Sequence, residues 1–376
     1  MANKGGGKIA KQIRKCMSVK DCGEAVGTMS GTLKNSVAQE APTNLERIKP
    51  EELNRIWDEV TLEDIEYLAR EFPGRVCVNC VACSSPDYQA VYQKLGYTYN
   101  RCHFCDSLFI SPRLPKEGIA YFFRHSKYTK FAESVYQTVA EERKRIIFEP
   151  RWRKLKAALL GLNVSFPIEN FLEVGASLGL FASVVIERGD VVNFDAIEPS
   201  SGALQHLKRV GIRNVFTGME EEYVGKLAAI YDIVLCNSAM EVTFSPEEFI
   251  RNLKTFLKPG GLLVLSSPGA SGVDSLLLQE AQQNANPPHG QNYISNQGMQ
   301  LLAERCDLQL VEFASIGSLD VDIVLDHVSS RKDVDQSPFL KNAAKILGNA
   351  QFREGLQALL QKHGLTGVYL AILRLE

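Results

Sequence analysis

The sequence lacks any long apolar run. No stretch approaches the roughly 18 consecutive apolar residues that a membrane-spanning helix needs. The first twenty residues contain six lysines and arginines and no acid, but they lack the apolar core that a secretory signal requires. We therefore expect a cytoplasmic protein with no membrane partner.

The chain also lacks an excess of charge of either sign. It has 42 lysines and arginines against 44 acids, which gives a formal net charge of -2 at pH 7. Because a polyanion is usually held by a positive field, nucleic acid is an unlikely partner. Hydrophobic residues make up 45% of the 376 residues, as in ordinary globular proteins, and this length suggests about two domains. Nothing in the sequence indicates the oligomeric state.

Strands and helices alternate in the second half of the chain. An apolar run at 171–174 precedes a helical pattern, and similar runs follow at 194–198, 215–216, 231–236 and 262–267. Such βαβ alternation predicts a parallel sheet with helices on both faces. Two later runs, 308–316 and 368–375, would complete the sheet.

The first of these strands runs into a glycine-bearing turn. Glu173 stands at the strand end, and the small residues Gly175, Ala176, Ser177 and Gly179 follow it. Glycine has no Cβ, so a ligand can touch the backbone there. The rival interpretation is a dinucleotide site, but a carboxylate at this place would repel a pyrophosphate. An acid suits a cationic amino-acid group instead.

Polar residues also end two later strands. Glu198 closes the run at 194–198, where a carboxylate can accept hydrogen bonds from both ribose hydroxyls of an adenosine. Asn237 and Ser238 follow the run at 231–236, at the sheet edge where ligands bind in open α/β folds. We expect all three residues to line a cofactor cleft.

Four segments together resemble successive motifs of the class I S-adenosylmethionine-dependent methyltransferases. They are residues 173–179, 197–200, 232–242 and 257–261, in order and at fitting spacing. The resemblance implies an α/β, Rossmann-like, seven-stranded sheet that binds S-adenosylmethionine. Two departures stand out: Ser177 replaces the family's usual glycine, and Glu241-Val242 stands where many relatives show Glu-His.

Five of the nine cysteines fall within thirty residues. Cys80-x-x-Cys83 and Cys102-x-x-Cys105, separated by eighteen residues, are typical of a four-thiolate zinc ribbon. A zinc ion with four protein ligands has no open position, so its role would be structural. Cys77 also forms a C-x-x-C pair with Cys80, so the ligand set could include it instead.

The turns after the cysteine pairs need a residue in the left-handed region. Asp106 after the second pair suits that conformation, and Ser84 after the first suits it less well. The surrounding residues resemble the zinc-bearing lead domain of a methyltransferase subset that includes enzymes methylating nucleotide-linked deoxysugars at carbon. These residues are Gly96-Tyr97, Phe109, Pro112-Arg113, Tyr121-Phe122 and the later stretch 317–324.

Three regions follow from these patterns. Residues 1–49, rich in Gly, Ser, Thr and Lys, are expected to be a flexible basic lead. Residues 50–164 should form a small zinc-ribbon and helical domain, with one helix from Thr61 to about Pro73 and a mainly helical stretch at 117–161. Residues 165–376 should form the methyltransferase domain.

Methyl transfer from a sulfonium is an in-line displacement and can need a base. His289 lies in the loop after the fifth strand, where a histidine acts as the base in the resembling sugar enzymes, but its offset from Tyr293 differs by one residue. A surface histidine is an equally open interpretation. Tyr293 is predicted to orient the substrate, and Ser295 to cap the helix that follows. Asp320 and Asp322 are interpreted as polar positions of an extended segment.

The predicted function is methyl transfer from S-adenosylmethionine to a small molecule, a sugar nucleotide or natural-product intermediate, at carbon or oxygen. Two alternatives remain open. One is an RNA methyltransferase that uses the zinc ribbon for recognition. The other is a non-enzymatic zinc-ribbon scaffold with a degenerate cofactor fold.

Overall fold

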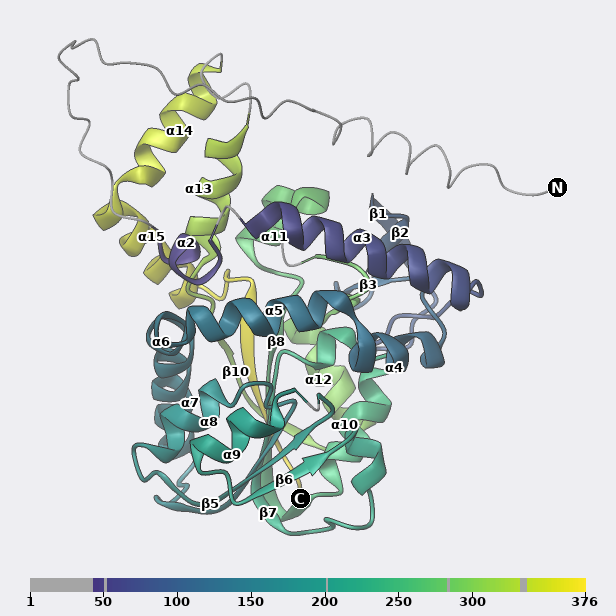
Figure 1. Ribbon diagram of the computed structural model, residues 1–376, viewed down its shortest axis with the longest axis vertical. Helices are drawn as coiled ribbons and strands as arrows, with labels where there is room; N and C mark the ends of the chain where they lie inside the picture. The colour runs from purple at the N-terminus through teal and green to yellow at the C-terminus, as the bar shows by residue number, and fades with distance from the viewer. Residues whose placement is uncertain (1–42, 51–52, 201, 283–284, 332–336) are drawn as a thin grey trace, which may run out of the picture. The chain divides into compact units, whose positions relative to one another are not determined.

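A computed structural model describes residues 43–50, 53–200, 202–282, 285–331 and 337–376 (Figure 1). Of the predicted basic lead, residues 1–49, the first 42 residues lie outside these ranges. Within the described ranges the chain folds into two β-sheets and the helices around them. Among the described residues, no helix combines the length and the apolar composition of a membrane span.

Helices dominate the first part of the described chain. They are α2 (Asn44–Ile48), α3 (Asn54–Glu71), α4 (Lys116–His125), α5 (Lys127–Thr138), α6 (Ala140–Arg143), the π-helix η2 (Lys144–Phe148) and α7 (Glu149–Gly161). The mainly helical stretch predicted at 117–161 is therefore confirmed. The helix expected to begin at Thr61 begins seven residues earlier, at Asn54. Thr61 lies inside it and donates its hydroxyl to the carbonyl of Trp57, 2.7 Å away.

A small antiparallel sheet surrounds the cysteine pairs. Its strands are β1 (Tyr88–Lys94), β2 (Tyr97–Cys102), β3 (Leu108–Ile110) and β9 (Asn292–Tyr293), in that order. β9 comes from a distant part of the chain and pairs Tyr293 with Leu108. The segment after the fifth strand of the large sheet is thus built into the cysteine-bearing sheet.

The large sheet has the seven predicted strands. Their order is β10 (Gln309–Ser315), β11 (Val368–Arg374), β8 (Leu257–Pro268), β7 (Tyr231–Asn237), β4 (Ile168–Val174), β5 (Val191–Glu198) and β6 (Asn214–Thr217). Strands β4 to β8 are parallel, as expected. β11 lies antiparallel between β8 and β10, so the two later runs complete the sheet as expected and make it a mixed one.

Helices cover both faces of this sheet because successive strand residues point to opposite sides. Phe171 belongs to the hydrophobic cluster that contains α7, α8 (Leu180–Ile186) and α9 (Leu204–Val210). Its neighbour Leu172 belongs to the other cluster, with α10 (Pro246–Lys254) and α12 (Asn296–Arg305) (Figure 1). Cys80, Cys102, Cys105 and Phe109 share that second cluster. The cysteine-bearing sheet is therefore packed into the core on one face of the large sheet.

Four further helices lie near the end of the chain: α11 (Val273–Leu278), α13 (Asp320–Ser330), α14 (Pro338–Gly348) and α15 (Ala350–Lys362). Short 3₁₀ turns occur at η3 (Glu220–Tyr223), η4 (Met240–Val242) and η5 (Gln279–Ala281). The extended segment predicted around Asp320 and Asp322 is wrong. Both are buried in the first turn of α13, where carboxylates favour a helix N-terminus, and Asp322 forms an ion pair with Arg353 at 2.7 Å.

Candidate functional site

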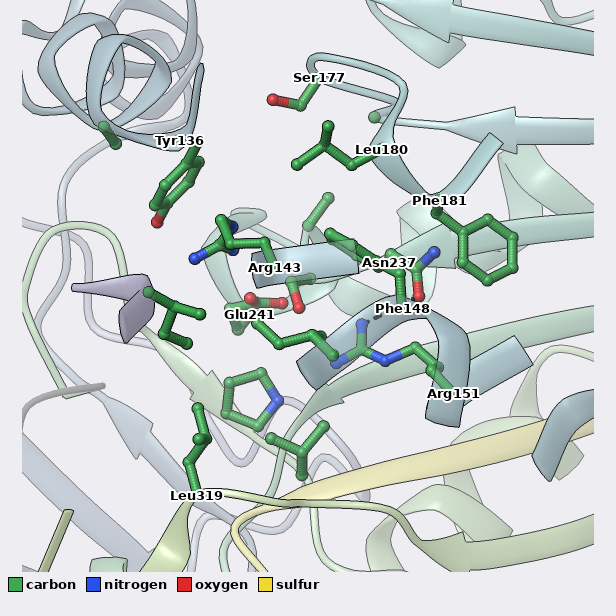
Figure 2. Close-up of a pocket in the computed structure, with 18 of the residues that line it drawn as sticks. Tyr136, Arg143, Phe148, Arg151, Ser177, Leu180, Phe181, Asn237, Glu241 and Leu319 are labelled. Carbon is green, nitrogen blue, oxygen red and sulfur yellow. Dashed lines mark hydrogen bonds between the residues drawn. The ribbon is translucent and has the colours of Figure 1, made fainter. Parts of the chain in front are cut away.

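A cavity of about 460 Å³ opens at the carboxyl ends of β4, β5 and β7. The sheet supplies one wall, through Glu173, Glu198 and Asn237. The opposite wall comes from the helices that precede β4, here called the lead helices (α2 to α7), and includes Tyr128 and Tyr136 of α5. Figure 2 shows part of this lining, with side chains from both walls directed into one space. The cavity lies at the sheet edge where open α/β folds bind their ligands.

The turn after β4 follows a backbone path that suits small residues. Gly175, Ser177 and Gly179 have φ values of 77°, 48° and 71°. Gly175, Ala176 and Ser177 line the cavity, as predicted, but Gly179 does not. A Cβ on Gly179 would lie 3.0 Å from Leu207, so this glycine lets α9 pack closely behind the turn. The prediction that Gly179 contacts the ligand is therefore not supported.

Glu198 holds the end of β5 against this turn. One carboxylate oxygen, Oε2, accepts from the backbone N–H of Ser177 at 2.6 Å, and the other, Oε1, accepts from that of Ser200 at 2.8 Å. Burial raises the pKa of Glu198 to about 7, although both hydrogen bonds oppose that rise. A carboxylate offers about four acceptor sites, so two remain for a ligand in the cavity.

Glu173 and Asn237 form a second polar group on the sheet wall. Asn237 donates from Nδ2 to Oε1 of Glu173 at 3.1 Å, and its Oδ1 accepts from Arg151 Nη1 at 3.1 Å. Oε2 of Glu173 is buried with no hydrogen-bond partner in the described chain. Burial raises the pKa of Glu173 to about 8. A buried carboxylate without a partner is costly, so a cationic ligand group here would be stabilised. Ser238, which follows Asn237, also lines the cavity.

Several charged residues on the lining were missed from the sequence, among them Arg143, Arg151 and Glu241 (Figure 2). The guanidinium carbon of Arg143 lies 3.6 Å from the ring centroid of Tyr136. Glu241 accepts a hydrogen bond from Ser267 Oγ at 2.8 Å, and burial raises its pKa to about 7. The two arginines lie in helical sequence without a motif, so no local signal marks them. Glu241 lies inside the motif at 232–242, but only the fold shows that it faces the cavity.

His289 lies on the cavity wall rather than on the outer surface. Its ring centroid lies 5.1 Å from that of Tyr128 and 6.2 Å from that of Phe122. Burial lowers the pKa of His289 to about 4, so the imidazole is neutral near pH 7. No side-chain hydrogen bond links the ring to another described residue.

Tyr293 is not brought to the cavity. It lies in β9 with 1% of its surface exposed, and its ring centroid is 6.2 Å from that of Tyr99. Pairing of β9 with β3 places this residue in the core of the small sheet, so a substrate-orienting role for Tyr293 is not supported. The capping role predicted for Ser295 is confirmed, since its hydroxyl accepts from the N–H of Gly298 at 2.9 Å.

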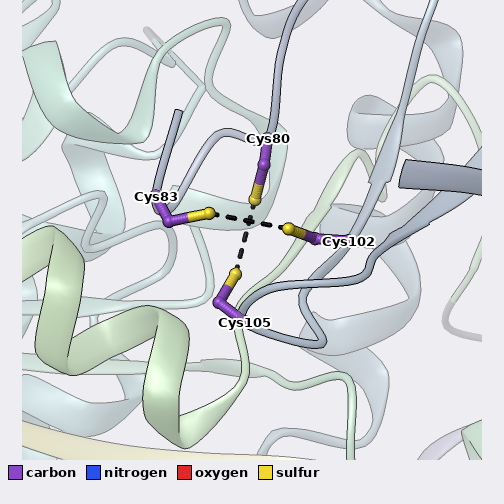
Figure 3. A group of neighbouring side chains, drawn as sticks. All are labelled: Cys80, Cys83, Cys102 and Cys105. Atoms are coloured by element: carbon purple, nitrogen blue, oxygen red, sulfur yellow. Dashed lines mark hydrogen bonds between the residues drawn. The ribbon is translucent and has the colours of Figure 1, made fainter. Parts of the chain in front are cut away.

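The four predicted cysteine ligands meet at one point (Figure 3). The sulfur atoms of Cys80, Cys83, Cys102 and Cys105 all lie within 4.8 Å of one another. Sulfurs around a tetrahedral zinc are about 3.8 Å apart, given a Zn–S distance of about 2.3 Å. Cys77 is exposed and outside the group, so the structure favours the first ligand set.

Both cysteine pairs form the same kind of turn. The N–H of Ser84 donates to the carbonyl of Cys80 at 2.8 Å, and that of Asp106 donates to the carbonyl of Cys102 at 3.0 Å. Ser84 has a φ of 62° and Asp106 a φ of 59°. Both turns thus have the left-handed residue that the sequence analysis expected, with serine in the first and aspartate in the second.

Comparison with known families finds a match for the middle of the chain, which contains most strands of the large sheet. Residues 131–313 match a family model described as a methyltransferase domain. The matched residues, just under half of the chain, are thus similar to S-adenosylmethionine-dependent methyltransferases of class I. These residues include the turn after β4, Glu198, Asn237 and His289.

Two curated relatives align with part of the chain. The malonyl-[acyl-carrier protein] O-methyltransferase 2 of Ilyobacter polytropus is 26% identical over 132 residues, which cover 34% of this chain and 49% of the relative. The ubiquinone biosynthesis O-methyltransferase of Escherichia fergusonii is 31% identical over 109 residues, which cover 28% of this chain and 45% of the relative. The chain thus spans about half the length of these relatives.

Solved structures that align with the chain include the plantazolicin methyltransferase BpumL in complex with S-adenosylhomocysteine. That alignment has a TM-score of 0.43 at 15% identity and covers 69% of this chain and 95% of the other. A second is an S-adenosylmethionine-dependent methyltransferase of Archaeoglobus fulgidus, with a TM-score of 0.37 at 17% identity. It covers 59% of this chain and 93% of the other.

Proposed function

We propose that the protein transfers the methyl group of S-adenosylmethionine to a small-molecule acceptor inside the 460 Å³ cavity. The observation that carries this proposal is the meeting of Glu173, Glu198 and the turn after β4 in one cavity within the methyltransferase domain. The cofactor supplies a methyl group on a sulfonium. The protein's part is to bind, align and exclude water.

The polar lining suggests how the cofactor is held. Glu198 would accept from the ribose hydroxyls with the acceptor sites that Ser177 and Ser200 leave open. Glu173, whose Oε2 has no partner among the described residues, would receive the cofactor's ammonium group. Arg151, tied to the same group through Asn237, would pair with the cofactor's carboxylate.

The remaining predicted cofactor residues would contribute through the backbone. Gly175 and Ala176 bring the turn close to the cavity, and Ser238 lies on its wall with a φ of 56°. Gly179 would support the turn from behind by admitting Leu207 of α9.

We assign the role of the base to one of two side chains, His289 or Glu241. His289 is neutral near pH 7 and makes no side-chain hydrogen bond to the described residues, so a ring nitrogen is available. Glu241 is the second candidate, because it faces the same cavity with a pKa of about 7. A base is most effective when its pKa lies near the working pH, which favours Glu241 for a weakly acidic acceptor.

The lining supports a small acceptor over a polynucleotide. Aromatic side chains from the lead helices, among them Trp57, Phe122 and Tyr128, close the cavity opposite the sheet. A cavity of this volume is typical of small-molecule sites, which span about 300–1,000 Å³. A sugar nucleotide or natural-product intermediate remains our proposed class, methylated at carbon or oxygen.

The four cysteines are proposed to hold a structural zinc ion. Thiolates in two C-x-x-C turns fit that ion, and Cys80, Cys102 and Cys105 are buried within the hydrophobic core. The ion would fix the small sheet against the methyltransferase domain. The division into a lead domain at 50–164 and a catalytic domain at 165–376 likewise stays a proposal.

The test is methyl transfer by the purified full chain. Candidate acceptors are incubated with S-adenosylmethionine, and release of S-adenosylhomocysteine is measured. Acceptor-dependent release that His289→Ala or Glu241→Gln abolishes would support the proposal. If the protein binds neither S-adenosylmethionine nor S-adenosylhomocysteine, the non-enzymatic scaffold becomes the better account.

A further inference from the structure

Two guanidinium groups share the cavity without a carboxylate partner. Arg143 and Arg151 both line it, and among the described residues neither has a carboxylate oxygen within 4.0 Å of its nitrogens. The charge of Arg143 also acts on Arg151, whose pKa falls to about 10 mainly because it is buried. Carboxylates line the same cavity, and Glu241 and Glu173 act on Arg151 in the opposite sense, but none of them pairs directly with either guanidinium, so an anion can still bind there.

The Arg143 side chain is fixed by packing and has an unpaired hydrogen-bond donor. Its guanidinium packs on the Tyr136 ring, which fixes the plane of the fork. Its Nε is buried and has no hydrogen-bond partner in the described chain. A buried donor that is left unpaired costs free energy, so a ligand that accepts from it would bind favourably.

The hydrogen bonds of the two arginines differ, and this difference assigns the cofactor's carboxylate to one of them. Arg151 is joined to Asn237 and through it to Glu173, the group proposed to hold the amino-acid end of S-adenosylmethionine. The single carboxylate of the cofactor would therefore pair with Arg151. Arg143, which has no link to that group, is left for the acceptor.

We propose that Arg143, held on Tyr136, binds an anionic oxygen group of the methyl acceptor, so that the acceptor is a carboxylate- or phosphate-bearing small molecule. Arginine donates two parallel hydrogen bonds to either group, which makes the recognition directional. The proposal rests on the proposed function, since it divides one cavity between cofactor and acceptor.

Binding of simple anions tests this division on the full chain saturated with S-adenosylhomocysteine. Inorganic phosphate and acetate are titrated separately by calorimetry at constant ionic strength, with chloride as the balancing anion. We expect at least one of them to bind, and Arg143→Gln to weaken that binding about tenfold or more. The preferred anion distinguishes a phosphate-bearing from a carboxylate-bearing acceptor.

Matched variants separate this proposal from the cofactor site. Arg145→Gln removes an exposed arginine two residues away, paired with Glu142 at 2.6 Å, and should leave anion binding unchanged. Arg151→Gln should weaken S-adenosylhomocysteine while Arg143→Gln leaves its affinity intact. Equal anion binding by Arg143→Gln and the wild type, or none to the loaded wild type, would overturn the proposal. Failure of S-adenosylhomocysteine to bind would instead overturn the proposed function.

Discussion

Replacing Glu198 with glutamine tests the ribose contact that the account assigns to this carboxylate. The two oxygens already accept from Ser177 and Ser200, at 2.6 and 2.8 Å. Glutamine keeps the shape but removes the charge, and its amide nitrogen must face one of these two backbone donors. The variant therefore loses acceptor strength toward the ligand.

The size of this effect follows from the strength of charged hydrogen bonds. A hydrogen bond to a charged group contributes roughly 1.5–3 kcal/mol, and a tenfold change in affinity corresponds to about 1.4 kcal/mol. Loss of the carboxylate should weaken S-adenosylhomocysteine by about 10- to 100-fold. Adenosine, which keeps the ribose and lacks the amino-acid part, should lose a similar factor.

The pH dependence of adenosine binding gives a second readout. The pKa of Glu198 is raised to about 7, so the carboxylate is present above that pH and is lost as the pH falls through it. Adenosine affinity should therefore fall by up to about tenfold per unit below pH 7 in the wild type and stay flat in Glu198→Gln.

Calorimetry on both proteins supplies the measurement. Glu220→Gln is the matched control, because Glu220 is also a buried glutamate with a raised pKa but lies outside the cavity. It should leave both affinities unchanged. If Glu198→Gln binds S-adenosylhomocysteine as tightly as the wild type does, the assignment of the ribose contact is wrong.

Three further predictions concern the other parts of the site. Glu173→Gln should weaken S-adenosylhomocysteine in calorimetry but spare adenosine, and equal losses for both ligands would move the ammonium contact elsewhere. Cys102→Ser should lower the bound zinc, measured by elemental analysis, and should lower the melting temperature by about 5 °C or more. Cys77→Ser, at an exposed cysteine, should change neither. A stable Cys102→Ser variant that still holds zinc would contradict the ligand set. If Glu241 is the base, the wild-type kcat should rise as the pH passes about 7, while the low residual kcat of Glu241→Gln stays flat. If His289 is the base, with its pKa near 4, the wild-type kcat should be level around pH 7, and His289→Ala should lower it about 100-fold.

Motifs that carry their own local chemistry could be predicted from the sequence. The four cysteines, the turn after β4 and Glu198 all lie where strand-end and C-x-x-C patterns predict them. Each depends on contacts within a few residues or on the regular order of a parallel sheet. Local geometry is what a single sequence records best.

Features that depend on distant segments were missed or misplaced. Tyr293 pairs with β3, almost two hundred residues earlier, so its burial could not be inferred from its own loop. Asp320 and Asp322 alternate with apolar residues as in a strand, yet their contacts with Gln357 and Arg353 of α15 stabilise a helix. Arg143 and Arg151 line the cavity only because the lead helices pack over the sheet.

The most direct test of the central claim is calorimetric titration of the full chain with S-adenosylmethionine and S-adenosylhomocysteine, with zinc quantified on the same sample. We expect saturable, one-to-one binding of both ligands by zinc-loaded protein. Zinc-loaded, folded protein that binds neither ligand would contradict it.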